Sequence, residues 1–444
     1  MKRLGKDMIS FIGIFILTAL CCLIVLLLTG MIPQEAIKEK SVESAEYFCN
    51  SELYPYVIKE QFNTRWDNYA DNILVNIMYH VDQERLLSSL LEASYYQQEG
   101  EYIYESFLAS VQEEKEPNNP YFRYWHGMQV FLRPLFLITD IEGTRIILGI
   151  FLLCLTLLTS VLLIKNKEKA LGIIYLLGNV FIQSWVCFFC IEYISTFLIM
   201  NIITIFMIRL CNRYGADRTT LNRKAALLFC ISGVTTCFFD FLTTETLTVT
   251  IPLFVLLIFV WRSQQLKTLK QEVLFLTGQG IVWGISYGMM FTLKWILASI
   301  VLGKAAFGKA LESAAVRMTG TVSLDNGEES ANFFQRLLGA IGRNQGCLFP
   351  LREDMRLGTV LLLFGGMIFI VFAIIYLLRG KNFSMRLILL LSLLCLVPYA
   401  RYMVLANHAY IHFFFTYRAQ LILVLVLLFC AWEFAGKSLC KATK

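Results

Sequence analysis

Two aspartates, Asp67 and Asp71, stand four residues apart in the stretch TRWDNYADN. On a helix this spacing places both carboxylates on one face. A carboxylate held in a site can act as a general base that takes a proton from a hydroxyl group. The same spacing also occurs on the solvated face of a surface helix. The two residues are therefore candidate catalytic residues, and the pattern does not choose between them.

A short segment, Asn119–Pro134 (NPYFRYWHGMQVFLRP), combines aromatic and cationic side chains just before a long apolar run. Its candidate substrate-binding residues are Arg123, Trp125, His126 and Arg133. Arginine forks match phosphate oxygens, and aromatic rings offer flat apolar surfaces. The segment is therefore a candidate binding site. The alternative is an aromatic belt at a membrane interface, with arginines that reach water.

Ionisable residues also gather near the ends of later apolar runs. Such residues are costly at membrane depth and are functional candidates by default. The candidates for substrate binding are Asp240, Arg401, His408, His412 and Arg418, and three more residues share their placement: Glu192, Glu245 and Lys294. An interface position explains any single one of them. Eight on one side of a membrane predict a polar cavity that opens outward.

His408 and His412 are four residues apart, which also suits a pair of zinc ligands. Catalytic zinc normally has three protein ligands, and no third ligand stands at a suitable spacing. We therefore expect neither a metal site nor a cofactor. The sequence also lacks a nucleotide-binding loop, and no nucleic-acid partner is expected.

The composition is that of a membrane protein, because 57% of the 444 residues are hydrophobic and only 16% are charged. Soluble proteins have about 45–50% apolar and about 25% charged residues. Ten stretches approach the roughly 20 apolar residues that a span needs, and lipid forces each to be helical. They are 9–31, 144–164, 170–188, 190–208, 225–243, 246–261, 274–302, 357–378, 386–405 and 416–435. The predicted fold class is an all-α polytopic membrane protein.

Charge predicts the orientation of these spans. The segments on the N-terminal side of the membrane hold 20 Lys/Arg and 5 Asp/Glu, whereas residues 32–143 hold 8 Lys/Arg and 19 Asp/Glu. By the positive-inside rule, both termini are cytosolic. The expected regions are 1–31 (cytosolic N-terminus and an uncleaved first span), 32–143 (first outward loop), 144–302 (spans two to seven), 303–356 (second outward loop) and 357–444 (the last three spans and a cytosolic tail).

The first outward loop is predicted to be partly helical, since 35–48 and 83–98 show apolar residues at three- and four-residue spacing. Each outward loop carries one cysteine, Cys49 and Cys347. A disulfide between them is possible outside the cytosol. The simpler interpretation is that both cysteines are unpaired small hydrophobic residues. The sequence does not supply the geometry that decides whether a disulfide forms.

This arrangement resembles the GT-C superfamily of integral-membrane glycosyltransferases, which take a sugar from a polyprenyl-phosphate carrier. It is similar in particular to bacterial members linked to cell-surface polysaccharides. The stretches that carry the likeness are WDNYADNILVN, YFRYWHGMQVFLRPLF, FFDFLTTETLTVTIPL and NHAYIHFFFTYR. The resemblance implies a multi-pass protein of a bacterial plasma membrane that transfers a sugar to a glycan acceptor on the outer face.

In that family an acidic residue of the first outward loop serves as the base or orients the acceptor. Asp67 and Asp71 match this place, although the adjacent acidic pair of some branches is missing, since Ala70 precedes Asp71. A transporter or flippase of lipid-linked glycans is a second hypothesis. It predicts paired discontinuous spans with a polar site near the midplane. A polysaccharide polymerase is a third, because it also has large outward loops.

Overall fold

The computed structural model describes residues 2–303, 305–319, 333–348, 366 and 385–442. Within these ranges the chain forms helices and loops without any strand. Tyr56 with Arg65 and Tyr95 with Asn119 form only isolated bridges. The expected all-α fold is thus confirmed for the described part of the chain.

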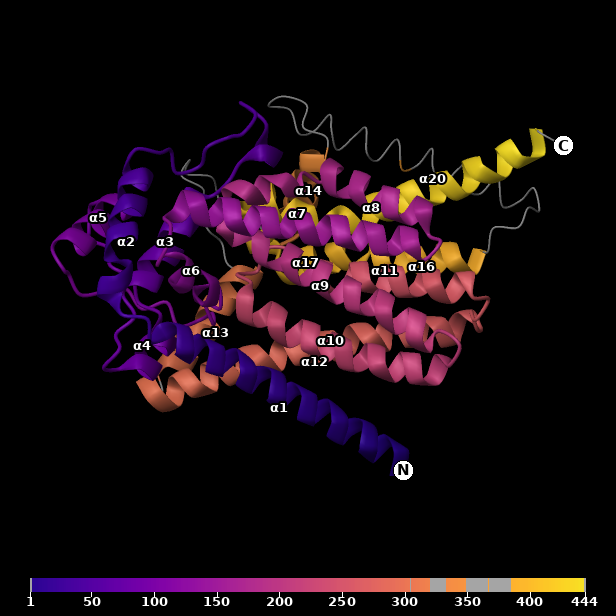
Figure 1. The fold of residues 1–444 in the computed structure, drawn as a ribbon, viewed down its shortest axis with the longest axis horizontal. Coiled ribbons are helices and arrows are strands. Elements are labelled where there is room, and N and C mark those ends of the chain that lie inside the picture. The colour runs from indigo at the N-terminus through magenta and orange to yellow at the C-terminus, as the bar shows by residue number, and fades with distance from the viewer. Residues whose placement is uncertain (1, 304, 320–332, 349–365, 367–384, 443–444) are drawn as a thin grey trace.

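The segment after the first helix folds into short helices that gather at one end of the molecule (Figure 1). They are α2 (Gln34–Cys49), η1 (Phe62–Thr64), α3 (Asn68–Tyr79), α4 (Leu86–Glu92), α5 (Ile103–Gln112) and α6 (Gln129–Leu135). The helix predicted over 35–48 is α2. The helix predicted over 83–98 is shorter, because Ala93 ends α4 in a left-handed conformation with a φ of 51°.

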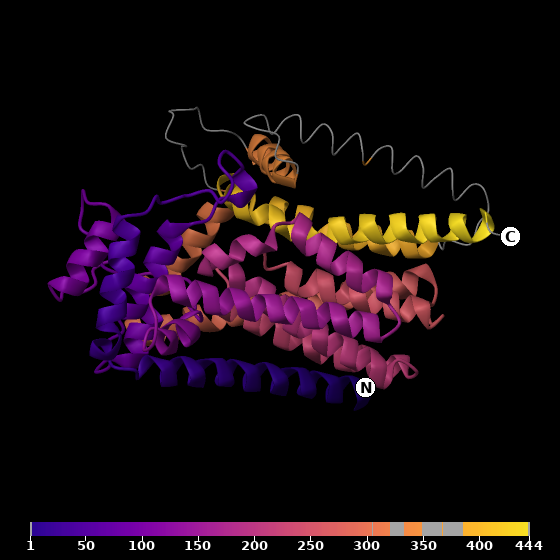
Figure 2. The ribbon, with the colours of Figure 1, turned by 45° about the horizontal axis from the view of Figure 1, so that its top comes forward.

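Longer helices form the bundle beside this region, with both described chain ends toward its far end (Figures 1 and 2). They are α1 (Lys2–Gly30), α7 (Ile141–Lys165), α8 (Lys169–Phe181), α9 (Ile191–Tyr214), α10 (Arg218–Phe239), α11 (Leu247–Arg262), α12 (Leu269–Leu302), α16 (Met385–Cys395), α17 (Val397–Val404) and α20 (Leu421–Ala442). Shorter pieces are η2 (Ser184–Phe189), α13 (Ala305–Thr319), α14 (Phe333–Leu348), α18 (Ala406–Ile411), α19 (Phe413–Thr416) and η3 (Tyr417–Gln420).

Six helical stretches within the described ranges are long and apolar enough to cross a membrane. They are Asp7–Gly30, Ile141–Lys165, Ile191–Tyr214, Leu269–Leu302, Met385–Val404 and Phe413–Glu433. These six match the predicted spans 9–31, 144–164, 190–208, 274–302, 386–405 and 416–435. The protein is therefore a membrane-embedded helical protein.

The other four predicted spans have different outcomes. The stretch 170–188 contains α8, which has 13 residues and ends at Phe181. Gln183, two residues later, has a φ of 57°. Helix α11, in place of 246–261, has 16 residues. Span 225–243 corresponds to α10, which is helical but is not among the six. Span 357–378 lies almost wholly outside the described residues, so the count of ten stays a prediction.

Polar caps fix where several helices begin. Asp140 Oδ1 accepts a hydrogen bond from Gly143 N (3.0 Å) at the start of α7, and Asp217 Oδ1 accepts one from Thr219 N (3.0 Å) at the start of α10. Thr268 and Gln271 form a capping box at the start of α12. These side chains satisfy backbone N–H groups that have no partner inside the helix.

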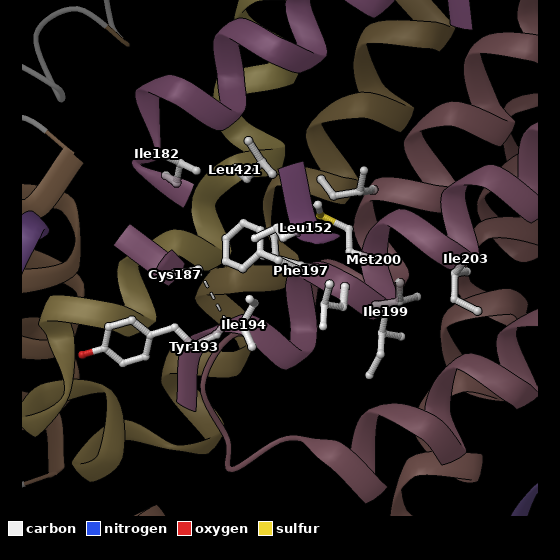
Figure 3. Packing of buried hydrophobic residues seen from close by; sticks show 14 of the residues in the cluster. Leu152, Ile182, Cys187, Tyr193, Ile194, Phe197, Ile199, Met200, Ile203 and Leu421 are labelled. Atoms are coloured by element: carbon white, nitrogen blue, oxygen red, sulfur yellow. Dashed lines mark hydrogen bonds between the residues drawn. The ribbon is translucent and has the colours of Figure 1, made fainter. Parts of the chain in front are cut away.

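Helix α9 lies in the middle of the bundle and packs against α7, α10 and α11. Figure 3 shows Phe197 and Met200 of α9 with Leu152 of α7 in this apolar core. All three side chains are buried. Helix α9 is thus packed on several sides. This packing fixes the position of its first turn, at Ile191, from which side chains face the short helices.

Candidate functional site

A polar cavity of about 140 Å³ lies between the start of α3, the start of α9 and the α18–α19 segment. It brings together three of the predicted site residues, Asp67, His408 and His412. Its remaining lining is Tyr54, Tyr69, Ala70, Ile73, Leu74, Tyr121, Tyr124, Glu192, Phe241, Arg317 and Phe415. A carboxylate, imidazoles and aromatic rings therefore share one cavity.

Asp67 is the N-cap residue of α3, and its Oδ1 accepts a hydrogen bond from Ala70 N (2.8 Å). The side chain is only 4% exposed. Burial disfavours the charged carboxylate and raises the pKa of Asp67 to about 7, with the nearby Asp71 carboxylate adding to the rise. A base with a pKa near neutrality suits proton abstraction from a hydroxyl group.

Asp71 lies one turn later but has a different environment. Its Oδ2 accepts hydrogen bonds from Arg145 Nη2 (2.7 Å) and Ile191 N (2.9 Å), and its Oδ1 accepts one from Glu192 N (3.0 Å). Asp71 is fully buried and does not line the polar cavity. Its carboxylate therefore joins α3 to α7 and to the first turn of α9, while Asp67 is the one of the two that faces the cavity.

Two further buried side chains of the cavity carry a polar atom without a partner among the described residues. They are Glu192, through Oε2, and His408, through Nδ1. Burial lowers the pKa of His408, and it lowers the pKa of His412 to about 3, so both imidazoles are neutral near pH 7. Both side chains therefore have polar atoms able to hydrogen-bond to a group inside the cavity.

A second, apolar cavity of about 330 Å³ adjoins the polar one. The two cavities share Tyr124 and Arg317. Its remaining lining is Arg123, Leu242, Tyr287, Gly288, Phe291, Thr292, Trp295, Ala310, Ser313, Ala314, Met318 and Leu405. This lining comes mainly from α12 and α13, and it is mostly aromatic and aliphatic. An apolar chain therefore fits beside the polar cavity, with an arginine at the junction.

The two arginines of the apolar cavity converge on one hydroxyl group. Arg123 Nη1 and Arg317 Nη1 each donate to Ser313 Oγ at 3.0 Å. Neither forms an ion pair with a carboxylate in the described part of the chain. The Nε atom of each is buried without a partner there. Two neighbouring cations without a countercharge predict an anionic ligand.

Two of the other predicted residues, Asp240 and Arg401, shape the cavities without lining them. Asp240 accepts hydrogen bonds from Thr243 N and Oγ1, and Arg401 Nε donates to Glu245 Oε1 (2.8 Å). These contacts hold the turn between α10 and α11. That turn supplies Phe241 to the polar cavity and Leu242 to the apolar one.

Arg133 and Arg418 were both candidates for substrate binding, yet they have no partner in common. Arg133 donates to the carbonyls of Thr29, Ile32 and Met78, which joins the end of α1 to the end of α3. Both side chains are fully buried. The contacts of Arg133 favour a scaffolding role over phosphate binding.

Arg418 is linked to the loop that precedes α3. Its Nη2 donates to the carbonyl of Asn63 (3.0 Å), and Tyr417 Oη donates to the same oxygen (3.1 Å). Asn63 precedes Asp67 by four residues in the chain. Arg418 therefore supports the loop that carries Asp67 rather than facing either cavity.

Trp125 and His126 do not line either of the two cavities. Trp125 Nε1 donates to the carbonyl of Met290 (2.9 Å) on α12. The His126 ring contacts the rings of Tyr121 and Tyr124, and its Nε2 lies 2.9 Å from the carbonyl oxygen of Tyr121. His126 thus contacts two tyrosines that line the polar cavity, while Trp125 joins this segment to α12.

Sequence reasoning missed Arg317 and the role of Glu192. Arg317 lies in α13, within the predicted second outward loop, and no local sequence pattern marks it as a binding residue.

Cys49 and Cys347 are both free cysteines. Within the described ranges no group of three His, Cys, Asp or Glu residues could hold a metal ion.

No protein-family model, no curated protein and no solved structure matches the chain. The function must therefore be argued from the residues of the site.

Proposed function

We propose that the protein is a membrane glycosyltransferase that moves a sugar from a polyprenyl-phosphate carrier to a glycan acceptor. The observation that carries this proposal is the position of Arg317, which lines both the apolar cavity and the polar cavity that contains Asp67. A donor of this class has an apolar chain, a phosphate and a sugar in that order. The two cavities and the arginine between them offer matching surroundings in the same order.

In this assignment the first isoprene units lie in the apolar cavity and the phosphate lies at Arg123 and Arg317. The sugar and the acceptor occupy the polar cavity. Asp67 takes the proton of the acceptor hydroxyl, whose oxygen forms a bond to the anomeric carbon. The bond from that carbon to the phosphate oxygen breaks, and the phosphate keeps the electron pair. The two guanidinium groups stabilise the charge that it gains.

The proposed setting is the outer face of a bacterial plasma membrane. The basic segments between spans favour cytosolic termini, and the two cavities lie at the opposite end of the bundle from the chain ends. No resident cofactor is needed for this chemistry. A transporter or flippase of lipid-linked glycans, or a polymerase, is the alternative, because both would also hold a lipid phosphate beside a glycan.

The test uses purified protein in nanodiscs with undecaprenyl-phosphate hexoses that carry a radiolabelled sugar. Octyl glycosides and extracted cell-surface glycans are the acceptors. We expect transfer of label to an acceptor with at least one donor, and release of undecaprenyl phosphate in equal amount. Movement of an intact labelled lipid across vesicles without transfer would support the transporter instead. Extension from a diphosphate-linked glycan alone would support the polymerase.

A further inference from the structure

Glu192 occupies a fixed place in the first turn of α9. Its backbone N–H donates to Asp71 Oδ1 (3.0 Å), and the preceding Ile191 N–H donates to Asp71 Oδ2 (2.9 Å). The side chain is 9% exposed and lines the polar cavity. Asp71 therefore fixes the backbone at Glu192 through both of its carboxylate oxygens, next to the polar cavity.

The charged and titratable groups around Glu192 do not neutralise it. Asp67, Arg317, His408 and His412 line the same cavity from the start of α3, from α13 and from the α18–α19 segment, with Tyr54, Tyr69, Tyr121 and Tyr124. The carboxylates of Asp67, Asp71 and Asp240 all act on Glu192 electrostatically. Within the described ranges Glu192 forms no ion pair, and its Oε2 has no partner.

Neither Asp67 nor Glu192 forms an ion pair in the described part of the chain, although Arg317 lines the same cavity and Arg65 acts on Asp67. The Arg65 guanidinium lies over the rings of Tyr54 and Phe414. Arg145 pairs with Asp71, Arg401 pairs with Glu245, and Arg317 donates to Ser313. Two buried carboxyl groups in one cavity that both lack an ion-pair partner cannot both be ionised cheaply. One proton between them removes most of the repulsion while leaving one group able to act as a base.

We propose that Asp67 and Glu192 share a single proton, so that Glu192 is a positioning residue that sets the ionisation of the base Asp67. In the resting site the proton is distributed between the two carboxyl groups, and the form in which Glu192 holds it leaves Asp67 charged. Glu192 then donates a hydrogen bond to an oxygen of the bound sugar or acceptor. When Asp67 takes the proton of the acceptor hydroxyl, both groups are protonated, and one proton passes to water after the product leaves.

This inference rests on the proposed function only for the use of the proton; the sharing itself is tested without turnover. The probe is dicyclohexylcarbodiimide, an apolar reagent that modifies protonated carboxyl groups. The protein in nanodiscs is treated across a pH series, and mass spectrometry of peptides measures the modification of Asp67 and of Glu192 separately. Variants are Glu192→Gln and Asp67→Asn, with Glu142→Gln, an exposed residue at the start of α7, as the matched control.

A shared proton predicts reciprocal shifts. In Glu192→Gln the pH of half-modification of Asp67 falls by about one unit or more, because a neighbouring negative charge is removed. In Asp67→Asn the half-modification of Glu192 falls likewise. Glu142→Gln changes neither. Each variant is used to measure the modification of the other residue. If one of the two variants does not fold, the measurement in the other variant still tests the proposal.

The shared proton would be overturned if Asp67 kept its pH of half-modification in Glu192→Gln and Glu192 kept its own in Asp67→Asn. A Glu192 that is never modified at any pH would overturn it as well. The transfer assay separates this result from the proposed function. Reciprocal shifts in a protein that transfers no sugar would keep the carboxyl pair and remove the glycosyltransferase. Sugar transfer without shifts would keep the enzyme and remove the pair.

Discussion

Arg145 and Asp71 form a buried ion pair, in which Arg145 Nη2 and Nε donate to the same Asp71 oxygen at 2.7 and 3.0 Å. Arg145 is 4% exposed and Asp71 is fully buried. The pair joins α3 to α7, while the same carboxylate holds the first turn of α9. This contact separates two aspartates that look alike in the sequence, since it occupies Asp71 and leaves Asp67 to the cavity.

Asp71→Asn therefore tests a structural role. Removing one partner of a buried pair leaves an uncompensated charge on Arg145 and costs about 3–5 kcal/mol. We expect a large loss of thermal stability in detergent, and partial recovery in Asp71→Asn combined with Arg145→Gln. A variant that unfolds at the wild-type temperature but transfers no sugar would show that Asp71 has a catalytic role.

The pH dependence of transfer follows from Asp67. Burial raises the pKa of this residue to about 7, so below that pH the base is mostly protonated. Turnover with saturating substrates should rise about tenfold per pH unit toward neutrality and level off above it. Because the folded state binds this proton more tightly than the unfolded chain does, the contribution of Asp67 to stability falls as the pH rises through the same range. A rate that is constant between about pH 5 and pH 8 would exclude Asp67 as the base.

Arg123→Lys and Arg317→Lys test the phosphate position. A lysine keeps the charge but loses the planar fork that donates two bonds to one anion. Losing one charge-assisted bond is worth about 1.5–3 kcal/mol, which weakens donor affinity roughly ten- to a hundredfold. Titration with undecaprenyl phosphate measures this affinity. Arg209→Lys, an exposed residue toward the other end of α9, is the control, and equal affinity in all three variants and the wild type would remove the proposed site.

Arg133→Lys and Arg418→Lys should behave in the opposite way. Arg133 bridges three backbone carbonyls and Arg418 bridges two, and the shorter donor set of lysine cannot reach them all. Thermal unfolding in detergent should shift to lower temperature for both. Affinity of the folded protein for undecaprenyl phosphate should stay at the wild-type value. A selective loss of that affinity without loss of stability would return these residues to the phosphate site.

Composition and the length of apolar runs were enough to predict an all-helical membrane protein. They failed for span 170–188, because Gln183 and the 3-10 turn after it shorten α8 in a way that hydropathy does not register. Asp67 was found from its place in the first loop. Its distinction from Asp71 depends on Arg145, which lies 74 residues further along the chain. No local pattern reveals such a contact.

Cations were harder to assign than carboxylates. Arg133 and Arg418 looked like ligands because each stands among aromatic residues near an apolar run, yet each donates to backbone carbonyls instead. Arg317 carried no signal, since its meaning comes from Ser313 on its own helix and from Arg123 and Tyr124 in a distant segment.

The central claim is that Asp67 is the base of a sugar transfer from a lipid phosphate. Its most direct test is a comparison of Asp67→Asn with the wild type in nanodiscs, using a labelled undecaprenyl-phosphate hexose that the wild type accepts. Asparagine keeps the shape of the side chain and cannot take a proton. We predict unchanged affinity for the donor, an unchanged melting temperature and a loss of turnover of about 10²-fold or more. Turnover within a few-fold of the wild type would contradict the account.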